Sequence, residues 1–165
     1  MRIALIGSAP SSTLLAPFDD PSWTIWGCSP GASTVIRRLD AFFELHPYSP
    51  SDPTYHAEYV EWLKGLPVPV YMAMALPMFP ASIRYPVEAM LARFGRNFFT
   101  SSLAWMCAFA IDTIEHARAK GDTGEHEIGF WGVDMAASDE YYHQKPGCLY
   151  FIEKARERGI KVTIP

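Results

Sequence analysis

Length, composition and charge set the first limits on what this chain can be. It has 165 residues, of which 49% are hydrophobic and 19% charged, and its formal net charge is −4. A chain of this size can bury the core of one domain, and the balance excludes a disordered chain. The acidic charge, with no Lys/Arg run, argues against nucleic acid as a partner, and no apolar run is long enough to span a membrane.

The cysteines and the amino-terminal segment bear on the compartment. Cys28, Cys107 and Cys148 are odd in number and widely spaced, and no cysteine has the spacing of a metal site. The first apolar run, residues 1–7, is too short for a signal peptide. We therefore expect reduced thiols in a soluble, cytoplasmic protein, and the 14% share of aromatic residues is compatible with a homo-oligomer.

The first half of the chain alternates short apolar runs with turn-rich segments. Residues 2–6 are a continuous apolar run ending at Gly7, which is typical of a strand buried on both faces of a parallel sheet. The same reasoning predicts strands at residues 23–26, 41–45 and 68–72, and helices at 13–16, 32–39 and 55–64. Three prolines predict a long loop over residues 73–86.

The second half contains the strongest helix signal. Thr100 or Ser101 can cap a helix whose stretch 103–114 is apolar on nearly every side, so this helix should be central and buried. A strand at 127–133, a tyrosine-rich loop, a helix at 149–158 with Gly159 as its C-cap, and a strand at 160–164 follow. Strands separated by helices predict an α/β, Rossmann-like three-layer sandwich with a mostly parallel sheet, in a single domain over residues 1–165.

Ligands of open α/β sheets lie beyond the carboxyl ends of the strands, and this rule selects the candidate binding residues. They are Gly7, Ser8, Ser11, Ser12, Cys28, Ser29, Thr100, Ser101, Ser102, Gly132, Tyr141, Tyr142, Gln144 and Lys145. Hydroxyls and free amides beside a helix start bind phosphate well, so segments 7–12 and 100–102 are the expected phosphate contacts. Ordinary strand–helix turns and helix caps are the alternative for both segments.

Three residues are candidates for catalysis: Asp134, Glu44 and His46. Asp134 follows Gly132 where a strand ends, and a carboxylate there can hold a ribose hydroxyl, a Mg²⁺ ion or a proton in transit, or can simply cap a helix. Glu44 and His46 lie on the same side of an extended segment, so either could serve as a base or a metal ligand, although a lone histidine is more often structural. The chain contains neither G-x-G-x-x-G nor a P-loop.

The two ends of the chain resemble a group of known proteins. The resemblance is carried by Gly7-Ser8-Ala9-Pro10-Ser11 after the first strand, Phe99-Thr100-Ser101-Ser102 at a helix start, Gly132-Val133-Asp134 after a late strand, and Tyr141, Tyr142 and Gln144. In these segments the chain resembles small Rossmann-like proteins encoded by tailed phages. More distantly it resembles the archaeal 6-hydroxymethyl-dihydropterin pyrophosphokinase-like family and bacterial sialyltransferases. The resemblance implies binding of a nucleotide, as a diphosphate donor or a nucleotide sugar.

Two functions of different classes fit these residues. The first is a nucleotide-dependent transferase that moves a phosphoryl, diphosphoryl or glycosyl group, with Asp134 holding Mg²⁺ or ribose and Glu44 or His46 as base. The second is a non-catalytic module that binds and sequesters a nucleotide-type ligand, with residues 73–86 as a lid. A structural subunit with a vestigial cleft is the third alternative.

Overall fold

The structure is a computed structural model, and it describes residues 1–133 and 139–165. Within these residues the strands are β1 (Arg2–Ile6), β2 (Trp23–Cys28), β3 (Ala41–Glu44), β4 (Val70–Met72), β5 (Ser82–Arg84), β6 (Glu127–Trp131) and β7 (Lys161–Thr163). The helices are α1 (Ala57–Gly65), α2 (Val87–Phe94), α3 (Ser102–Ala119) and α4 (Asp139–Glu157). Three short 3₁₀ turns are η1 (Thr13–Leu15), η2 (Pro30–Thr34) and η3 (Pro53–Tyr55).

The described strands form one sheet in which every neighbouring pair is parallel, in the order β5-β4-β3-β2-β1-β6-β7. The chain runs outward from β1 to β5 and then returns to β6 on the other side of β1. The sheet therefore has its switch point between β1 and β6, which is where such sheets bind ligands. Because Ile6 lies beside both Gly27 and Trp131, three strands end close together at this point.

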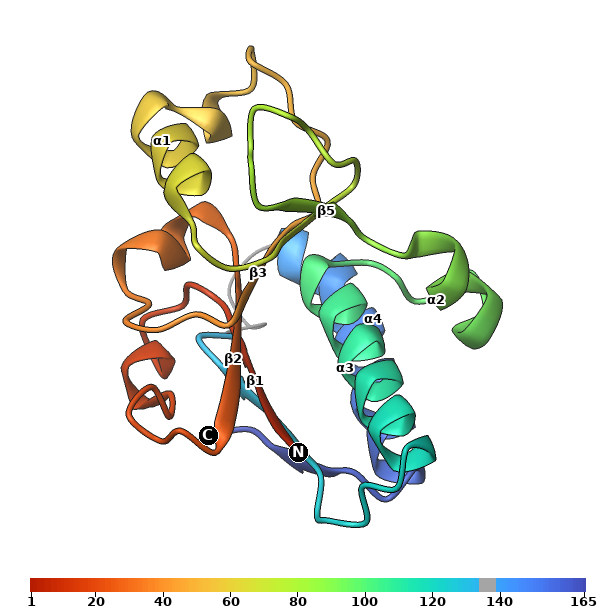
Figure 1. The fold of residues 1–165 in the computed structure, drawn as a ribbon. Helices are drawn as coiled ribbons and strands as arrows, with labels where there is room; N and C mark the ends of the chain where they lie inside the picture. The colour runs from red at the N-terminus through yellow and green to blue at the C-terminus, as the bar shows by residue number, and fades with distance from the viewer. Residues whose placement is uncertain (134–138) are drawn as a thin grey trace.

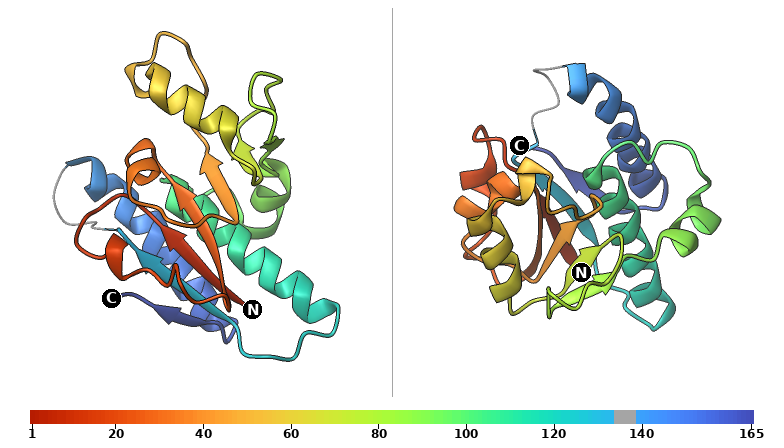
Figure 2. Two further views of the ribbon diagram at one scale, coloured as in Figure 1. Left: turned by 60° about the vertical axis from the view of Figure 1, so that its left-hand side comes forward. Right: turned by 90° about the horizontal axis from the view of Figure 1, so that it is seen from above.

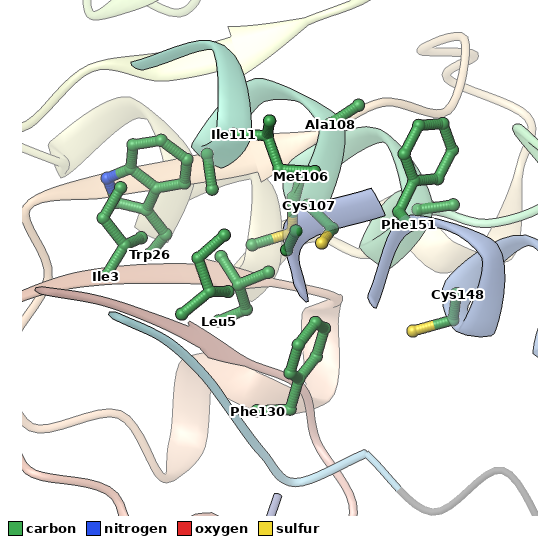
Figure 3. Packing of buried hydrophobic residues seen from close by; sticks show 14 of the residues in the cluster. Ile3, Leu5, Trp26, Met106, Cys107, Ala108, Ile111, Phe130, Cys148 and Phe151 are labelled. Atoms are coloured by element: carbon green, nitrogen blue, oxygen red, sulfur yellow. The ribbon is translucent and has the colours of Figure 1, made fainter. Parts of the chain in front are cut away.

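Helices cover both faces of the sheet, as the sequence predicted. In Figures 1 and 2, α2, α3 and α4 lie on one side, and α1 with the 3₁₀ turns lies on the other. The larger core lies under α3 and α4, where Leu5 and Phe130 from the sheet pack with Met106, Cys107 and Phe151 from the helices (Figure 3). Alternation along the strands sends their other residues into two smaller clusters on the opposite face.

Two elements lie where the sequence analysis predicted a loop or assigned nothing. Residues 73–86 are not all irregular, because β5 pairs with β4 inside this segment. A short strand at the edge of a sheet is compatible with nearby prolines, since only one of its sides must form hydrogen bonds. Helix α2 follows directly, and its apolar residues Val87, Met90, Leu91 and Phe94 recur at helical spacing.

The structure also corrects the prediction for the tyrosine-rich segment before residue 149. The sequence predicts a loop there, but α4 begins at Asp139 and includes Pro146. The misleading signal was Pro146-Gly147, because proline removes a helical hydrogen bond and glycine weakens a helix. Gly147 is needed here for packing, since a Cβ atom would overlap the Phe98 carbonyl oxygen and the Thr100 hydroxyl. Helix α4 is thereby held against the start of α3.

Smaller differences concern the first crossover connections. The predicted helix at 32–39 is only the five-residue turn η2, and the predicted helix at 13–16 is the three-residue turn η1. The strands at 41–45, 68–72, 127–133 and 160–164 are each found, with shorter bounds.

None of the helices in the described part of the chain combines the length and apolarity needed to cross a bilayer.

Candidate functional site

A cavity of about 250 Å³ lies at the carboxyl ends of β1, β2, β3 and β6 and against the start of α3. Its described lining is a mixture of polar and apolar residues, many of them small, from segments far apart in the sequence: Gly7, Ser8, Ala9, Cys28, Ser29, Pro30, His46, Thr100, Ser101, Ser102, Leu103, Gly132, Val133 and Gln144. Both α3 and α4 begin at this edge of the sheet (Figure 1). The cavity therefore lies where the sheet rule predicts a ligand.

Most of the predicted site residues meet in this cavity. Those found in the lining are Gly7, Ser8, Cys28, Ser29, His46, Thr100, Ser101, Ser102, Gly132 and Gln144. Ala9, Pro30, Leu103 and Val133 also line it and were missed, because apolar side chains carry no sequence signal of ligand contact. The residues Ser11, Ser12, Glu44 and Lys145 are not in the lining.

Three further predicted residues need separate mention. Asp134, the predicted catalytic residue and Mg²⁺ ligand, lies outside the described residues. Tyr141 and Tyr142 belong to α4, in a stretch whose side chains lie outside what the structure describes. Among the residues whose side chains the structure describes, no group of three His, Cys, Asp or Glu could hold a metal ion, and Mg²⁺ remains a prediction.

The floor of the cavity is a close crossing of the chain after β1 and the chain after β6. The Gly7 amide donates to the Trp131 carbonyl at 2.8 Å and the Ala9 amide donates to the Gly132 carbonyl at 2.9 Å. The Gly132 amide in turn donates to the Ser12 hydroxyl at 2.9 Å. A Cβ atom on Gly132 would lie 2.6 Å from the Gly7 carbonyl oxygen, so this crossing requires glycine.

In segment 7–12, two of the amides expected to be free for phosphate have partners within the protein. The amides of Gly7 and Ala9 extend the pairing with β6. The following turn η1 has only three residues and therefore no helix dipole of consequence. The Ser12 hydroxyl holds the crossing together, and Ser8 is the serine of this segment that lines the cavity.

The chain after β2 forms one wall. Ser29 has a left-handed backbone, with φ of 77°, and its hydroxyl donates to the Ser8 hydroxyl at 3.4 Å. Burial, followed by the nearby Glu44 carboxylate, raises the pKa of the Cys28 thiol to about 12. Cys28 is therefore a neutral wall residue at physiological pH rather than a nucleophile.

The start of α3 forms the opposite wall and is the main electropositive element of the cavity. Ser101 is the N-cap, and its hydroxyl accepts a hydrogen bond from the Ala104 amide at 3.1 Å. The Thr100 hydroxyl donates to the Gln144 carbonyl at 3.0 Å, which ties α4 to this turn. The amides of Ser102 and Leu103 occupy first-turn positions that have no acceptor within the helix. An 18-residue helix thus directs the positive end of its dipole at the cavity.

His46 and Glu44 lie at the end of β3, as a joined pair. His46 Nδ1 lies 2.9 Å from Glu44 Oε1, and the His46 amide donates to the same oxygen at 3.3 Å. The Tyr59 hydroxyl donates to Glu44 Oε2 in a short hydrogen bond. The Glu44 side chain is 1% exposed and the His46 side chain is 66% exposed, so His46 is the member of the pair that faces the cavity.

Tyr59 is a site residue that sequence reasoning missed. It lies in the helix predicted at residues 55–64 and packs in one buried cluster with Tyr55 and Leu63. Burial, and then the neighbouring Glu44 carboxylate, raises the pKa of Tyr59 far above its usual value. The phenol therefore stays protonated and donates to the carboxylate. A tyrosine in a helix face gives no sequence signal of such a long-range partner.

Comparisons with known proteins identify the fold. No family model and no curated protein sequence matches the chain. A sialyltransferase, CstII from Campylobacter jejuni, solved with the substrate analogue cytidine 5′-monophosphate (CMP), matches with a TM-score of 0.55 and 15% identity, over 99% of this chain and 78% of that one. The thiamine pyrophosphokinase from Bacillus subtilis matches with a TM-score of 0.50 and 13% identity, over 100% of this chain.

These likenesses establish an α/β fold of the type found in two transferases. The match to a bacterial sialyltransferase agrees, at the level of the fold, with the resemblance seen in the sequence. The chain spans 60% of the length of the pyrophosphokinase. At such low identity the shared fold carries no residue roles from one protein to the other.

Proposed function

We propose that this cavity binds a nucleotide through its phosphate and that the protein is a nucleotide-dependent transferase. The observation that carries the proposal is the start of α3, where the first-turn amides and the hydroxyls of Thr100, Ser101 and Ser102 surround one end of a cavity at the sheet's switch point. Helix starts bind anions because their amides are unpaired and the helix dipole is positive there.

The composition of the lining supports a phosphate group rather than a carboxylate held by arginine. No Lys or Arg is present among the described lining residues, so an anion would be held by amides, hydroxyls and His46. Backbone amides are suited to phosphate, since several can point at different oxygens of the same group. The small side chains of Gly7, Ser8 and Ser29 leave room for the rest of a nucleotide at the switch point.

The same geometry also suits group transfer. When a group leaves a nucleotide, negative charge accumulates on the phosphate oxygen that it leaves behind. Fixed amide dipoles aimed at that oxygen bind the transition state more tightly than the ground state, which is the usual electrostatic contribution to such reactions. The CMP-bound sialyltransferase among the structural neighbours is a protein of this reaction class, and it makes CMP a suitable first probe.

The proposal is tested by calorimetric titration with CMP, comparing the wild type with a variant that adds a negative charge at the start of α3. Ser102→Asp places a carboxylate in the first turn, where it favours the helix but repels phosphate. We expect it to weaken CMP binding by at least about tenfold, or about 1.4 kcal/mol. The neutral variant Ser102→Asn keeps the shape without the charge and should bind within about threefold of wild type.

A second control adds the same charge at the opposite end of the sheet. Thr123 is exposed in the connection before β6, so Thr123→Asp should leave CMP binding unchanged. No CMP binding by the wild type, or equal loss in Ser102→Asp and Thr123→Asp, would sink the proposed site. CMP binding with no turnover of any CMP-linked donor would favour the sequestering alternative.

A further inference from the structure

Apart from the start of α3, the most unusual feature near the cavity is the buried carboxylate of Glu44. Each of its oxygens has its own partner, His46 on Oε1 and the Tyr59 hydroxyl on Oε2. Burying a carboxylate is costly even when it is fully hydrogen-bonded, and an apolar side chain usually serves packing at least as well. Packing of α1 against the sheet therefore does not by itself explain a carboxylate at this position.

We propose that His46 is the proton-transferring residue of this cavity and that Glu44 and Tyr59 are its positioning residues. This inference rests on the proposed function, because it assigns the base that a transferase at this site would use. It also names the class of acceptor, a hydroxyl group. Glu44 itself is buried and is not among the described lining residues, so it acts through His46 and does not touch the acceptor.

The hydrogen-bond directions determine which nitrogen of His46 does the work. Burial keeps the Tyr59 phenol protonated, and its hydroxyl donates to Glu44 Oε2. The carboxylate of Glu44 has only acceptor oxygens, so it accepts at Oε1 as well. Glu44 Oε1 then accepts from the Nδ1–H of His46, as well as from the His46 backbone amide. In the neutral ring this assignment leaves the lone pair on Nε2. The Tyr55 hydroxyl donates to the His46 carbonyl at 3.2 Å and holds the backbone of the same residue.

The position of His46 suits a base opposite a leaving phosphate. His46 lines the same cavity as Ser102 and Leu103, at the end of β3 rather than at the start of α3. If a donor binds with its phosphate at the start of α3, the acceptor would approach the donor from the side of β3, where His46 lies. Such an arrangement brings reactants together without covalent attachment to the protein.

The proton and electron balance of the step is simple. The acceptor O–H bond breaks and its proton passes to His46 Nε2, while the oxygen forms a bond to the transferred group of the nucleotide donor. The bond between that group and the phosphate oxygen breaks, and the phosphate keeps the electron pair. Glu44 stabilises the imidazolium that forms, and the released phosphate remains at the amides of α3.

The first test reads the ionisation of His46 directly by nitrogen-15 NMR of the imidazole ring, with His46→Gln used to assign its signals. In the described part of the chain the titratable groups near His46 include Glu44 on β3, Asp52 and Tyr55 at η3, Cys28 in the same cavity lining and, behind Glu44, Tyr59 on α1. Wild-type His46 should carry its neutral-form proton on Nδ1. Glu44→Gln should lower the pH midpoint of ring protonation by about one unit, because an adjacent anion favours the charged ring.

The matched control is Asp52→Asn, which removes a carboxylate near His46 without touching the ring pair. In this variant the pH midpoint of His46 ring protonation should change by less than about 0.3 units, since Asp52 bonds mainly to Thr54. Tyr59→Phe keeps the ring that packs α1 and removes only the hydroxyl, and it should move the His46 midpoint while leaving the unfolding temperature within about 5 °C. A midpoint unchanged in both Glu44→Gln and Tyr59→Phe would overturn the positioning roles.

The second test separates binding from turnover. With CMP as ligand, His46→Gln should bind within about fivefold of wild type, and with a CMP-linked sugar as donor its turnover should fall at least about a hundredfold. Wild-type turnover in His46→Gln would overturn the assignment of the base. Failure of the wild type to bind CMP would instead sink the proposed function, while the NMR titration would still report whether His46 and Glu44 are coupled.

Discussion

Gly132 is the residue on which the geometry of the cavity depends most. It has a φ of 67°, and a Cβ atom there would overlap the Thr13 hydroxyl as well as crowd the Gly7 carbonyl. Gly159 has nearly the same φ, 66°, with no heavy atom within 4 Å of the position of a Cβ. The two glycines therefore share a backbone conformation and differ only in their surroundings.

This pair allows backbone strain to be separated from close approach. Gly159→Ala should lower the free energy of unfolding by about 1–2 kcal/mol, the usual cost of a left-handed alanine. Gly132→Ala adds an overlap with fixed backbone, and its loss should exceed that of Gly159→Ala by about 1–3 kcal/mol. Urea unfolding of both variants measures the difference. Equal losses would show that the crossing of the two chains at the cavity floor is looser than described.

Ser29 carries strain at the cavity wall without being a glycine. The non-glycine residues with positive φ in the described part of the chain are Ser29 and Phe98, and Phe98 lies in the connection before α3. Strained backbone of this kind is often found at functional sites. We expect Ser29→Gly to be about 1 kcal/mol more stable than Ser29→Ala, since both lose the hydroxyl and only the former relieves the strain. Thermal unfolding of the two variants measures this difference. A Ser29→Gly variant less stable than Ser29→Ala would contradict the strain at Ser29.

At the scale of elements, Glu127 joins three strands at the amino edge of the sheet. Its carboxylate accepts from Thr163 at 2.6 Å and pairs with Arg2 at 3.1 Å and Lys161 at 3.2 Å. Burial acts to raise the pKa of Glu127, but the hydrogen bonds from Thr163, Lys161 and Arg2 outweigh it and lower the pKa. This carboxylate therefore stabilises β1, β6 and β7 in its charged form.

The direction of this pKa predicts how stability depends on pH. A carboxyl group with a lowered folded pKa stabilises the protein above its unfolded pKa of about 4.3 and loses that contribution as the pH falls through the folded pKa. Glu127→Gln should cost about 1–2 kcal/mol at neutral pH, and the difference from wild type should shrink steadily in acid. Glu61→Gln, which breaks only an exposed pair with Lys64, should change stability by less than about 0.5 kcal/mol. A Glu127→Gln cost that persists unchanged in acid would contradict the pairing.

The elements that the sequence predicted best are those with the strongest local signals. Buried strands such as β1 and β6 are continuous apolar runs, and α3 has both a capping serine and a long apolar stretch. The start of α4 could not be predicted, because Pro146-Gly147 reads locally as a turn. Its helical form is compatible with tertiary contact between Gly147 and the chain at Phe98 and Thr100. The short edge strand β5 likewise depends on its partner β4, which local sequence does not reveal.

The sequence predicted the location of the cavity better than the roles of the residues in and around it. The sheet rule brought Ser29, His46 and Ser102 to one cavity from three different segments. It could not show that Ser12 serves the crossing at Gly132, or that Glu44 is buried behind His46 with Tyr59 as partner. Those roles depend on distances between segments, and a periodic pattern carries no such distances.

At the scale of the whole molecule, the two ends of the sheet differ in what they hold. The carboxyl end holds the cavity, the strained Ser29 and the start of α3, whereas the amino end holds the charged junction at Glu127. A ligand bound as proposed should therefore affect one end of the molecule and leave the other unchanged.

The most direct measurement is a backbone amide NMR titration with CMP, compared with cytidine, which lacks the phosphate. We expect CMP to shift the amide signals of Ser102 and Leu103 strongly and cytidine to shift them far less, while the amide signal of Thr123 at the opposite end moves with neither. Equal shifts of Ser102 and Leu103 with CMP and cytidine, or CMP shifts confined to residues away from the start of α3, would contradict phosphate binding at this helix.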